Sequence, residues 1–309
     1  MAKFGPVAVV IPTKNRPQDL DLTVETLLAQ TVLPRQLIVI DQSPADESER
    51  CVFQRCHTLD CEAQDSLELI YRRDPSITGL TAARNCSLRL VRTDIVLFLD
   101  DDVILEPDFI EQLLGAYQHR PDATGVSGIV TNYSPPSAIF RLWSRVFMRG
   151  PFRDDRQPAY WNAHRLRGGQ PMRVTRLGGG LMSFRMPAVA GMKFDENLHG
   201  ACDGEDVEFC SQLHPSSVLL IEPKARLIHN QSPEGRSGEH WLRRHARTMW
   251  YLYRRCWNHG VRNRLSLVWL NIGYALAGAA VSIRRLSLAP YLGITESIRE
   301  SRQLARSAD

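Results

Sequence analysis

Three consecutive aspartates, Asp100, Asp101 and Asp102, follow the apolar stretch from Ile95 to Leu99. Alternate residues of an extended chain project to the same face, so Asp100 and Asp102 can present two carboxylates to one metal ion while Asp101 points elsewhere. Mg²⁺ and Mn²⁺ prefer oxygen ligands, and Mg²⁺ is often shared between carboxylates and the phosphates of a substrate. The spacing therefore indicates a divalent cation site. The alternative is that the aspartates cap a helix beginning near Pro107, where negative charge is favourable.

The elements that must position these aspartates alternate between short apolar runs and amphipathic segments of helical length. Strands are predicted at 7–11, 37–40, 67–71 and 95–99, and helices at 17–30 and 80–91. This alternation is typical of an α/β fold with a mostly parallel sheet, in which ligands bind beyond the carboxyl ends of the strands. We expect three polar clusters to converge there: Pro12 to Arg16 after the first strand, Asp41 to Ser43 after the second, and the aspartates after the fourth.

Three further segments have less specific patterns. Residues 134–172 are rich in Pro, Arg, Trp and Tyr without a sustained period, which predicts a long recognition loop. The triplet 178–180 is all glycine, which suits either close approach of a ligand or a tight turn. Asp203 or Gly204 is expected to cap a helix that begins with Glu205 and Asp206, although acids in a first helical turn are ordinary.

Composition is typical of a globular protein rather than of a nucleic-acid-binding one. The 309 residues are 43% hydrophobic and 23% charged, and the net charge is only +4. Seven cysteines without a C-x-x-C pair indicate neither a zinc site nor a disulfide framework, which favours reduced thiols in the cytoplasm. The first apolar run begins at Val7 and is too short for a signal peptide, so the catalytic part is expected to stay where it is synthesised.

The order and spacing of several motifs resemble glycosyltransferase family 2 over about residues 5 to 232. The motifs are Val9 to Arg16, Ile40-Asp41, Gly79-Leu80 with Ala83-Arg84-Asn85, Phe98 to Asp102, Gly204-Glu205-Asp206, and His229. The resemblance implies a GT-A fold, a Rossmann-like sheet flanked by helices, for a catalytic domain at residues 1–232. In that fold a nucleotide-sugar donor lies over the carboxyl ends of the strands, and a D-x-D motif holds its pyrophosphate through a divalent metal.

The resemblance also implies which residues bind the donor, expected to be UDP-, dTDP- or GDP-linked. The nucleoside would contact the residues after the first two strands, where an aspartate could accept a hydrogen bond from a pyrimidine imide. The ribose and phosphates would lie along the residues that open the helix at 80–91, with a further ribose contact from the aspartate triplet. These expected donor-binding residues are Pro12, Thr13, Asn15, Arg16, Asp41, Gly79, Arg84, Asn85, Asp100 and Asp101.

The metal, Mg²⁺ or Mn²⁺, would be bound by Asp100, Asp102 and His229, with Asp102 the better candidate for direct ligation. His229 matches a histidine that completes the metal shell in some members of the family. The alternative is a histidine at a strand end whose hydrogen bonds are made within the protein. A metal at the donor would stabilise the charge that develops on the nucleoside diphosphate as it leaves.

The acidic pair Glu205 and Asp206 faces the acceptor in this family, and Asp206 is the candidate base. Removal of the proton of an acceptor hydroxyl during attack typically accelerates a reaction by about 10² to 10⁴. A single displacement of this kind inverts the anomeric configuration. Glu205 could instead position the acceptor, which is expected to be a saccharide or a lipid-linked saccharide in cell-envelope or exopolysaccharide synthesis.

Residues 233–309 are predicted to form a helical extension that associates with the cytoplasmic face of a membrane. Leu265 to Ile283 carries no formal charge and is flanked by arginines on both sides. The stretch is long enough to span, but its small and polar residues are equally compatible with a helix or hairpin on the membrane surface. The arginine-rich residues 236–264 suit anionic headgroups, at about 1 kcal/mol per basic residue. The alternative is a buried helix packed on the catalytic domain.

Two other classes of function remain open from the sequence. A nucleotidyltransferase would also combine an α/β sheet with a metal-binding acidic pair, but such enzymes usually carry a glycine-rich loop after the first strand, and residues 12–16 contain no glycine. A catalytically degenerate protein could bind nucleotide-sugar or membrane as a scaffold. The intact D-x-D and Glu-Asp motifs argue against this second alternative, which an assay of sugar transfer tests directly.

Overall fold

The computed structural model describes residues 2–133, 136–148, 169–198, 204–230, 238–256 and 260–307. Asp203 and most of the predicted loop at 134–172 lie outside these ranges. The chain forms two compact units. The first consists of Met1–Ser134, Pro158–Gly200 and Leu213–Ser232, and the second of Pro135–Gln157, Ala201–Gln212 and Pro233–Asp309. The second unit thus combines the C-terminal residues with two earlier segments of the chain.

The first unit is an α/β structure whose strands and helices follow the predicted alternation. Its strands are β1 (Phe4–Thr13), β2 (Leu33–Asp41), β3 (Glu68–Arg73), β4 (Ile95–Leu99), β5 (Val103–Leu105), β6 (Ala123–Val130), β7 (Met172–Val174), β8 (Leu181–Arg185) and β9 (Val218–His229). Its helices are α1 (Pro17–Leu28), α2 (Glu47–Cys56), α3 (Cys61–Ser66), α4 (Leu80–Leu88), α5 (Phe109–His119) and α7 (Met186–Val189). The four strands and two helices predicted from periodicity are all confirmed, with ends shifted by a few residues.

The strands form a single sheet in the order β3-β2-β1-β4-β8-β6-β9-β5, and β7 pairs with β9. The pairs from β3 to β4 are parallel, as predicted from the alternation of strands and helices. Beyond β4 the sheet is mixed, because β8 is antiparallel to both β4 and β6, while β6 and β9 are parallel. The carboxyl ends of β1, β2 and β4 therefore lie at one edge.

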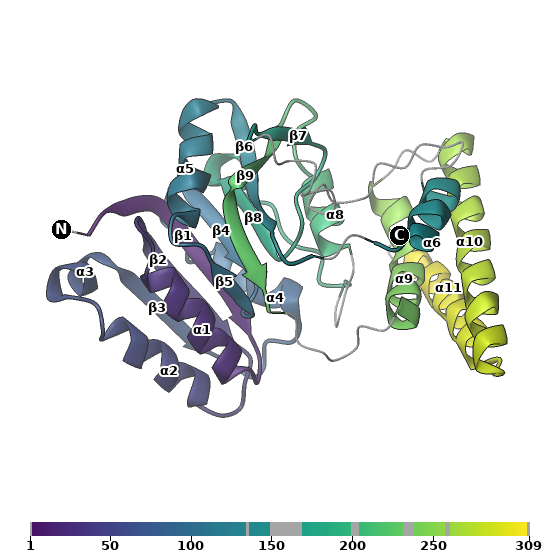
Figure 1. The fold of residues 1–309 in the computed structure, drawn as a ribbon, viewed down its shortest axis with the longest axis horizontal. Helices are drawn as coiled ribbons and strands as arrows, with labels where there is room; N and C mark the ends of the chain where they lie inside the picture. Colours follow the sequence, from purple (N-terminus) through teal and green to yellow (C-terminus); the bar gives the residue numbers. More distant parts are fainter. Residues whose placement is uncertain are drawn as a thin grey trace. The chain divides into compact units, whose positions relative to one another are not determined.

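Both faces of the sheet are covered. Odd-numbered residues of β1 such as Val7 and Ile11 belong to the main hydrophobic core, together with Leu20 of α1 and Leu113 of α5. Figure 1 shows α1 and α2 over the strands β1 to β3. On the opposite face the ring of Phe98 meets that of Phe194 edge to face, with centroids 5.3 Å apart. A strand buried on both faces explains why β1 and β4 are continuous apolar runs rather than alternating ones.

A buried network of hydroxyl groups joins α5 to the strands β6 and β8. The Tyr117 hydroxyl lies 2.9 Å from Ser183 Oγ and accepts a hydrogen bond of 3.1 Å from the backbone N–H of Val126. Ser183 Oγ in turn donates to the Val126 carbonyl at 2.6 Å. Burial raises the pKa of Tyr117, so the phenol stays protonated and can donate to Ser183. This network fixes β8, the strand that begins beside the aspartates.

The second unit is helical. It contains α6 (Ala138–Trp143), a π-helical turn (Ser144–Met148), α8 (Glu205–Ser211), α9 (Gly238–Cys256), α10 (Val261–Arg285) and α11 (Ala289–Ser307). Trp143 Nε1 donates to the Gly273 carbonyl of α10 at 3.0 Å, and a Cβ at Gly273 would overlap the ring of Phe147. Among the described helices, α10 alone is long and apolar enough to cross a membrane, with a mean hydropathy of 1.5 in its most apolar window.

Replacement of Tyr117 by Phe should lower the free energy of unfolding by about 1–3 kcal/mol, because it leaves the buried N–H of Val126 without its acceptor. Ser183→Ala removes the neighbouring hydroxyl of the same network. We therefore expect the two effects to be non-additive by roughly 0.5–3 kcal/mol in a double-mutant cycle measured by urea unfolding. Strictly additive effects would contradict a shared network.

Candidate active site

The three aspartates form a tight turn between β4 and β5, here called the aspartate turn (Asp100–Asp102). Thr23 of α1 fixes the backbone of this turn, since its hydroxyl lies 2.9 Å from the Asp101 carbonyl and 2.8 Å from that of Val103, and accepts the Val103 N–H at 3.0 Å. The Asp102 carbonyl accepts the N–H of Asn230 at 2.7 Å. The turn does not cap the next helix, because the N-cap of α5 is Asp108.

Asp101 points away from the other two carboxylates, as the alternation predicted. It accepts a hydrogen bond from Thr13 Oγ1 at 2.7 Å and one from Arg16 at 3.2 Å. Burial raises the pKa of Asp101 to about 6, although the Thr13 hydrogen bond and the charge of Arg16 act in the opposite direction. The predicted convergence of the loops after β1 and β4 is thus confirmed by direct contacts.

Asp100, Asp102 and His229 face one another on the other side of the turn. The three side chains offer ligand atoms that all lie within 4.8 Å of one another. His229 Nε2 is 2.8 Å from Asp102 Oδ1 and 3.7 Å from Asp100 Oδ2. Asp102 is buried, whereas the Asp100 carboxylate is 28% exposed and accessible from outside. The three predicted metal ligands are therefore brought together from two different strand ends.

The donor set fits Mg²⁺ or Mn²⁺. Two carboxylates and one imidazole are ligands that manganese accepts, and a partly exposed carboxylate leaves room for ligands from a substrate. Gly180, which precedes β8, makes this arrangement possible, because a Cβ at that position would overlap the Asp100 carboxylate. At Gly180 the backbone of the glycine triplet therefore comes close to the Asp100 side chain. The sequence alone did not distinguish a close approach from a simple tight turn.

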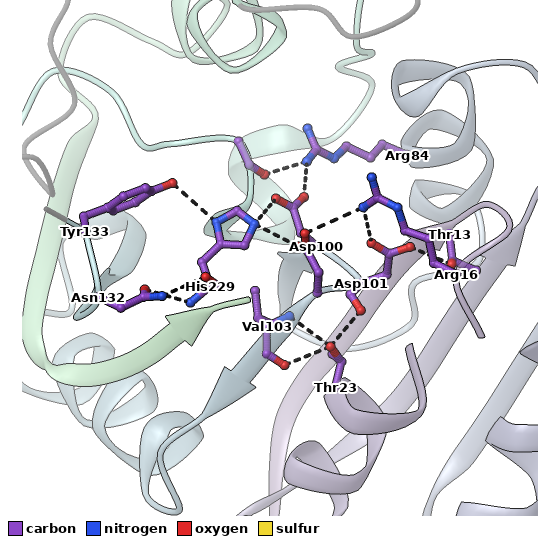
Figure 2. A network of polar contacts seen from close by, with 12 residues as sticks. Thr13, Arg16, Thr23, Arg84, Asp100, Asp101, Val103, Asn132, Tyr133 and His229 are labelled. Carbon is purple, nitrogen blue, oxygen red and sulfur yellow. Dashed lines mark hydrogen bonds and ion pairs between the residues drawn. The ribbon is translucent and has the colours of Figure 1, made fainter. Parts of the chain in front are cut away.

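His229 is held by two neighbours that the sequence did not indicate. The side-chain amide of Asn132 donates to the His229 carbonyl at 2.8 Å and accepts its N–H at 3.0 Å. The Tyr133 hydroxyl lies 3.3 Å from His229 Nδ1, so that Nε2 is the nitrogen turned toward the aspartates (Figure 2). Such partners orient a histidine ligand and set which of its nitrogens carries the proton. They follow β6, whose pairing with β9 could not be read from local patterns.

Arg84 and Asn85 are buried residues of α4, and Arg84 lies beside the candidate site. Arg84 is fully buried, donates to the Gly179 carbonyl at 2.6 Å and lies 3.6 Å from Asp100 Oδ1. The amide of Asn85 donates to the Phe194 carbonyl and accepts the Phe194 N–H. These contacts support two different segments, since Arg84 holds the glycine triplet before β8 and Asn85 holds Phe194 after α7. Their predicted contacts with donor ribose and phosphates stay a prediction.

The loops after β1, β2 and β3 are joined by hydrogen bonds at the expected nucleoside site. The N–H of Asn15, a residue with φ of 55°, donates to Ser43 Oγ at 2.7 Å. The Gly79 N–H donates to Gln42 Oε1 at 2.8 Å. Asp41 is buried and accepts the Tyr71 hydroxyl at 2.7 Å and the Ser43 N–H at 2.8 Å. Pro12 is buried beside Thr13, and the roles of these residues toward a nucleoside stay predictions.

The predicted acidic pair lies at the start of α8 in the second unit. Gly204 is the N-cap with φ of 116°, a conformation that glycine adopts without strain, and a Cβ there would meet Leu252 of α9. Glu205 is buried, whereas Asp206 is half-buried and accepts the N–H of Val207 at 2.8 Å. The helix predicted to begin at this pair is confirmed, while the catalytic roles of the two acids stay predictions.

Comparison with solved structures shows which fold this architecture shares. A mannosyltransferase from Pyrobaculum calidifontis, PcManGT in complex with GDP-Man and Mn²⁺, superposes with a TM-score of 0.56 at 15% identity over 98% of this chain and 86% of that chain. TarS of S. aureus gives a TM-score of 0.51 over 87% of this chain and 43% of that one. The fold is the predicted GT-A fold.

Residues 8–177 match the model of Glycosyl transferase family 2, and the chain belongs to this family. A glucosyl-dolichyl phosphate glucuronosyltransferase of Haloferax volcanii is 30% identical over 40% of this chain and 38% of its own length. Validoxylamine A glucosyltransferase of Streptomyces hygroscopicus subsp. limoneus is 27% identical over 69% of this chain and 49% of its own. The chain thus spans less than half the length of these two relatives.

Gly180→Ala should weaken Mn²⁺ binding by about tenfold or more, because the added Cβ displaces the Asp100 carboxylate. Binding is measured by titration with Mn²⁺, following the electron paramagnetic resonance of the free ion. Gly115→Ala is the matched control, since a Cβ at that position of α5 meets no atom within 4 Å. Equal Mn²⁺ affinities for the two variants would argue against Asp100 as a ligand.

Proposed function

We propose that the protein is an inverting glycosyltransferase that uses Mg²⁺ or Mn²⁺ to move a sugar from a nucleoside diphosphate to a hydroxyl of a saccharide or lipid-linked acceptor. The observation that carries the proposal is the Asp100, Asp102 and His229 cluster beside the joined loops after β1 and β2. Membership of the family supports transfer of a sugar over transfer of a nucleotide. A role in cell-envelope or exopolysaccharide synthesis is in keeping with one relative, succinoglycan biosynthesis protein ExoM of Rhizobium meliloti.

The proposed donor site rests on the charged residues of the candidate cation site and on the neighbouring loops after β1 and β2. A bound divalent ion supplies Lewis-acid stabilisation for the charge that develops on a departing diphosphate. Asp100, Asp102 and His229 would hold that ion. Arg16 is 40% exposed at its side chain and lies 3.6 Å from Asp102, which suits it to meet a phosphate oxygen. The nucleoside would lie against the loops that contain Thr13, Asn15 and Asp41.

The acceptor side rests on the acidic pair of α8. Asp206 would take the proton of the acceptor hydroxyl as its oxygen bonds to the anomeric carbon, while the bond from that carbon to the phosphate oxygen breaks. A single displacement of this kind inverts the anomeric configuration. Asp206 is favoured over Glu205 because it is half-buried, whereas Glu205 is buried and better suited to orient the acceptor or the helix.

The donor site is tested by thermal shift with UDP-, dTDP- and GDP-sugars, each with Mn²⁺ or with chelator. We expect one nucleotide class to raise Tm only with Mn²⁺, since a ligand stabilises the folded state according to its occupancy. Asp102→Asn should abolish the difference between Mn²⁺ and chelator, and Asp122→Asn, a change at an exposed aspartate paired with Arg120, should keep it. No shift with any donor on folded protein would favour a scaffold that does not bind these nucleotide-sugars, or a donor outside the panel.

Asp206→Asn should lower turnover by about 10² to 10⁴ while donor binding in the same thermal shift assay is unchanged. Glu205→Gln provides the comparison within the pair and should retain more activity than Asp206→Asn. Activity is measured as release of nucleoside diphosphate in the presence of acceptor. If the Asp206→Asn protein keeps more than about a tenth of wild-type turnover, Asp206 is not the base. That outcome would not contradict the proposed donor site.

A further inference from the structure

The outer surface of α10 is apolar without interruption over nineteen residues. Between Arg264 and Arg284 its exposed large side chains form what is here called the apolar stripe: Leu265 (51% exposed), Val268 (42%), Ile272 (45%), Leu276 (56%) and Ile283 (75%). Their spacing of three, four or seven residues places them on one face of the helix. At 1.5 Å per residue the stripe is about 27 Å long.

The outward face of α10 lacks the polar side chains expected for a helix on a water-soluble bundle, while its buried side combines apolar residues such as Leu267 and Leu270 with polar ones. Its polar residues Ser266, Asn271 and Ser282 are buried, whereas the residues of the apolar stripe face outward. A helix on the surface of a globular protein normally turns its apolar face to the core and its polar face to water. An uninterrupted apolar surface of this length marks a contact with a partner or a membrane.

Charge distinguishes between possible occupants of the stripe. Arg262 and Arg264 precede it and Arg284 and Arg285 follow it, and all four side chains are exposed. No acidic residue occurs between Val261 and Arg285. If α10 packed against α10 of a second copy, arginines would face arginines at both ends in either orientation. A partner surface that carries negative charge around an apolar region complements the arginines at both ends of the apolar stripe.

The packing of the helical unit favours a helix lying in the plane of a bilayer over one that spans it. The other side of α10 packs against α9 and α11, which are joined by an ion pair of 3.1 Å between Arg247 and Glu300. A spanning α10 would carry these charged helices into hydrocarbon, which is costly. A helix with one apolar face and basic residues at its ends instead inserts that face to a depth of about 5–10 Å.

The stripe ends in a hollow at the turn between α10 and α11. This pocket has a volume of about 390 Å³ and is lined by apolar side chains that include Ile283, Leu286, Leu288 and Tyr291. Leu286 and Leu288 are 94% and 70% exposed at its rim. A hollow lined in this way, next to Arg284 and Arg285, suits one acyl chain of a lipid whose anionic headgroup meets the arginines.

We propose that the apolar stripe and its terminal pocket dock the protein on a bilayer that contains anionic lipid, with α10 lying in the plane of the headgroups. The arginines at both ends of the stripe contact the headgroups, and the stripe contacts the acyl chains. This docking does not depend on the proposed sugar transfer. The two proposals are therefore tested separately, one by vesicle binding and the other by nucleotide binding and turnover.

Vesicle flotation of the full chain tests the docking surface. We expect the protein to float with phosphatidylcholine vesicles that contain phosphatidylglycerol and to bind much more weakly to phosphatidylcholine alone. Ile272→Glu combined with Leu276→Glu should lower the partition coefficient at least tenfold, about 1.4 kcal/mol, because it places two carboxylates in the stripe. Arg284→Gln combined with Arg285→Gln should lower it about fivefold for each arginine, and only on the anionic vesicles.

The controls separate docking from unfolding, general charge and self-association. Arg50→Gln combined with Arg92→Gln removes two exposed arginines of the first unit and should leave binding unchanged. Circular dichroism and the Mn²⁺ titration check that each variant is folded. The proposal is overturned if the folded wild type does not float, or if the Ile272→Glu and Leu276→Glu protein floats equally well. A concentration-dependent dimer in ultracentrifugation that these two changes abolish would assign the stripe to a second copy and overturn lipid docking.

Discussion

The candidate site depends on crowding three carboxylates into one turn at the end of a buried strand. Carboxylates placed so close together, two of them buried, repel one another unless donors or cations surround them. The neighbouring elements supply such groups from every side: Thr13 and Arg16 from the β1 loop, Arg84 from α4, and His229 from β9. The arrangement separates two tasks, because Asp101 is paired with Thr13 and Arg16 within the protein, while Asp100 and Asp102 face His229 and the Asp100 carboxylate is partly exposed.

Local patterns were sufficient for the parallel half of the sheet and for the two aspartates of the candidate cation site. The strands β1 and β4 and residues 37–40 of β2 contain continuous apolar runs. The alternation of side chains along an extended chain correctly separated Asp101 from its two neighbours. His229 was found through the resemblance to a family, since nothing in its own neighbourhood distinguishes it from a histidine at any strand end.

The sequence could not indicate contacts between residues far apart in the chain. Thr23 fixes the aspartate turn although the two are separated by about eighty residues in the sequence. Asn132 and Tyr133 contact His229 although nearly a hundred residues separate them from it. Arg84 and Asn85 belong to a motif expected to face the donor, yet Arg84 donates to the Gly179 carbonyl and Asn85 to the Phe194 carbonyl. The antiparallel strand β8 was also not predicted, because Ser183 and Arg185 interrupt its apolar residues, so it forms neither a continuous apolar run nor a polar face.

The pairing of β9 with β6 determines where β9 can gain or lose a residue without moving His229. Four residues of β9, Glu222 to Ala225, bulge from the ladder between the pairs Ser127–Ile221 and Ile129–Arg226, and Gly128 leaves space for the Ala225 carbonyl. From Leu227 to His229 the strand is paired residue by residue with β5, ending at Val103. A residue gained or lost within the bulge can be absorbed there. After the bulge, a gained residue would put Ile228, and a lost residue Asn230, in the place of His229 at the candidate cation site.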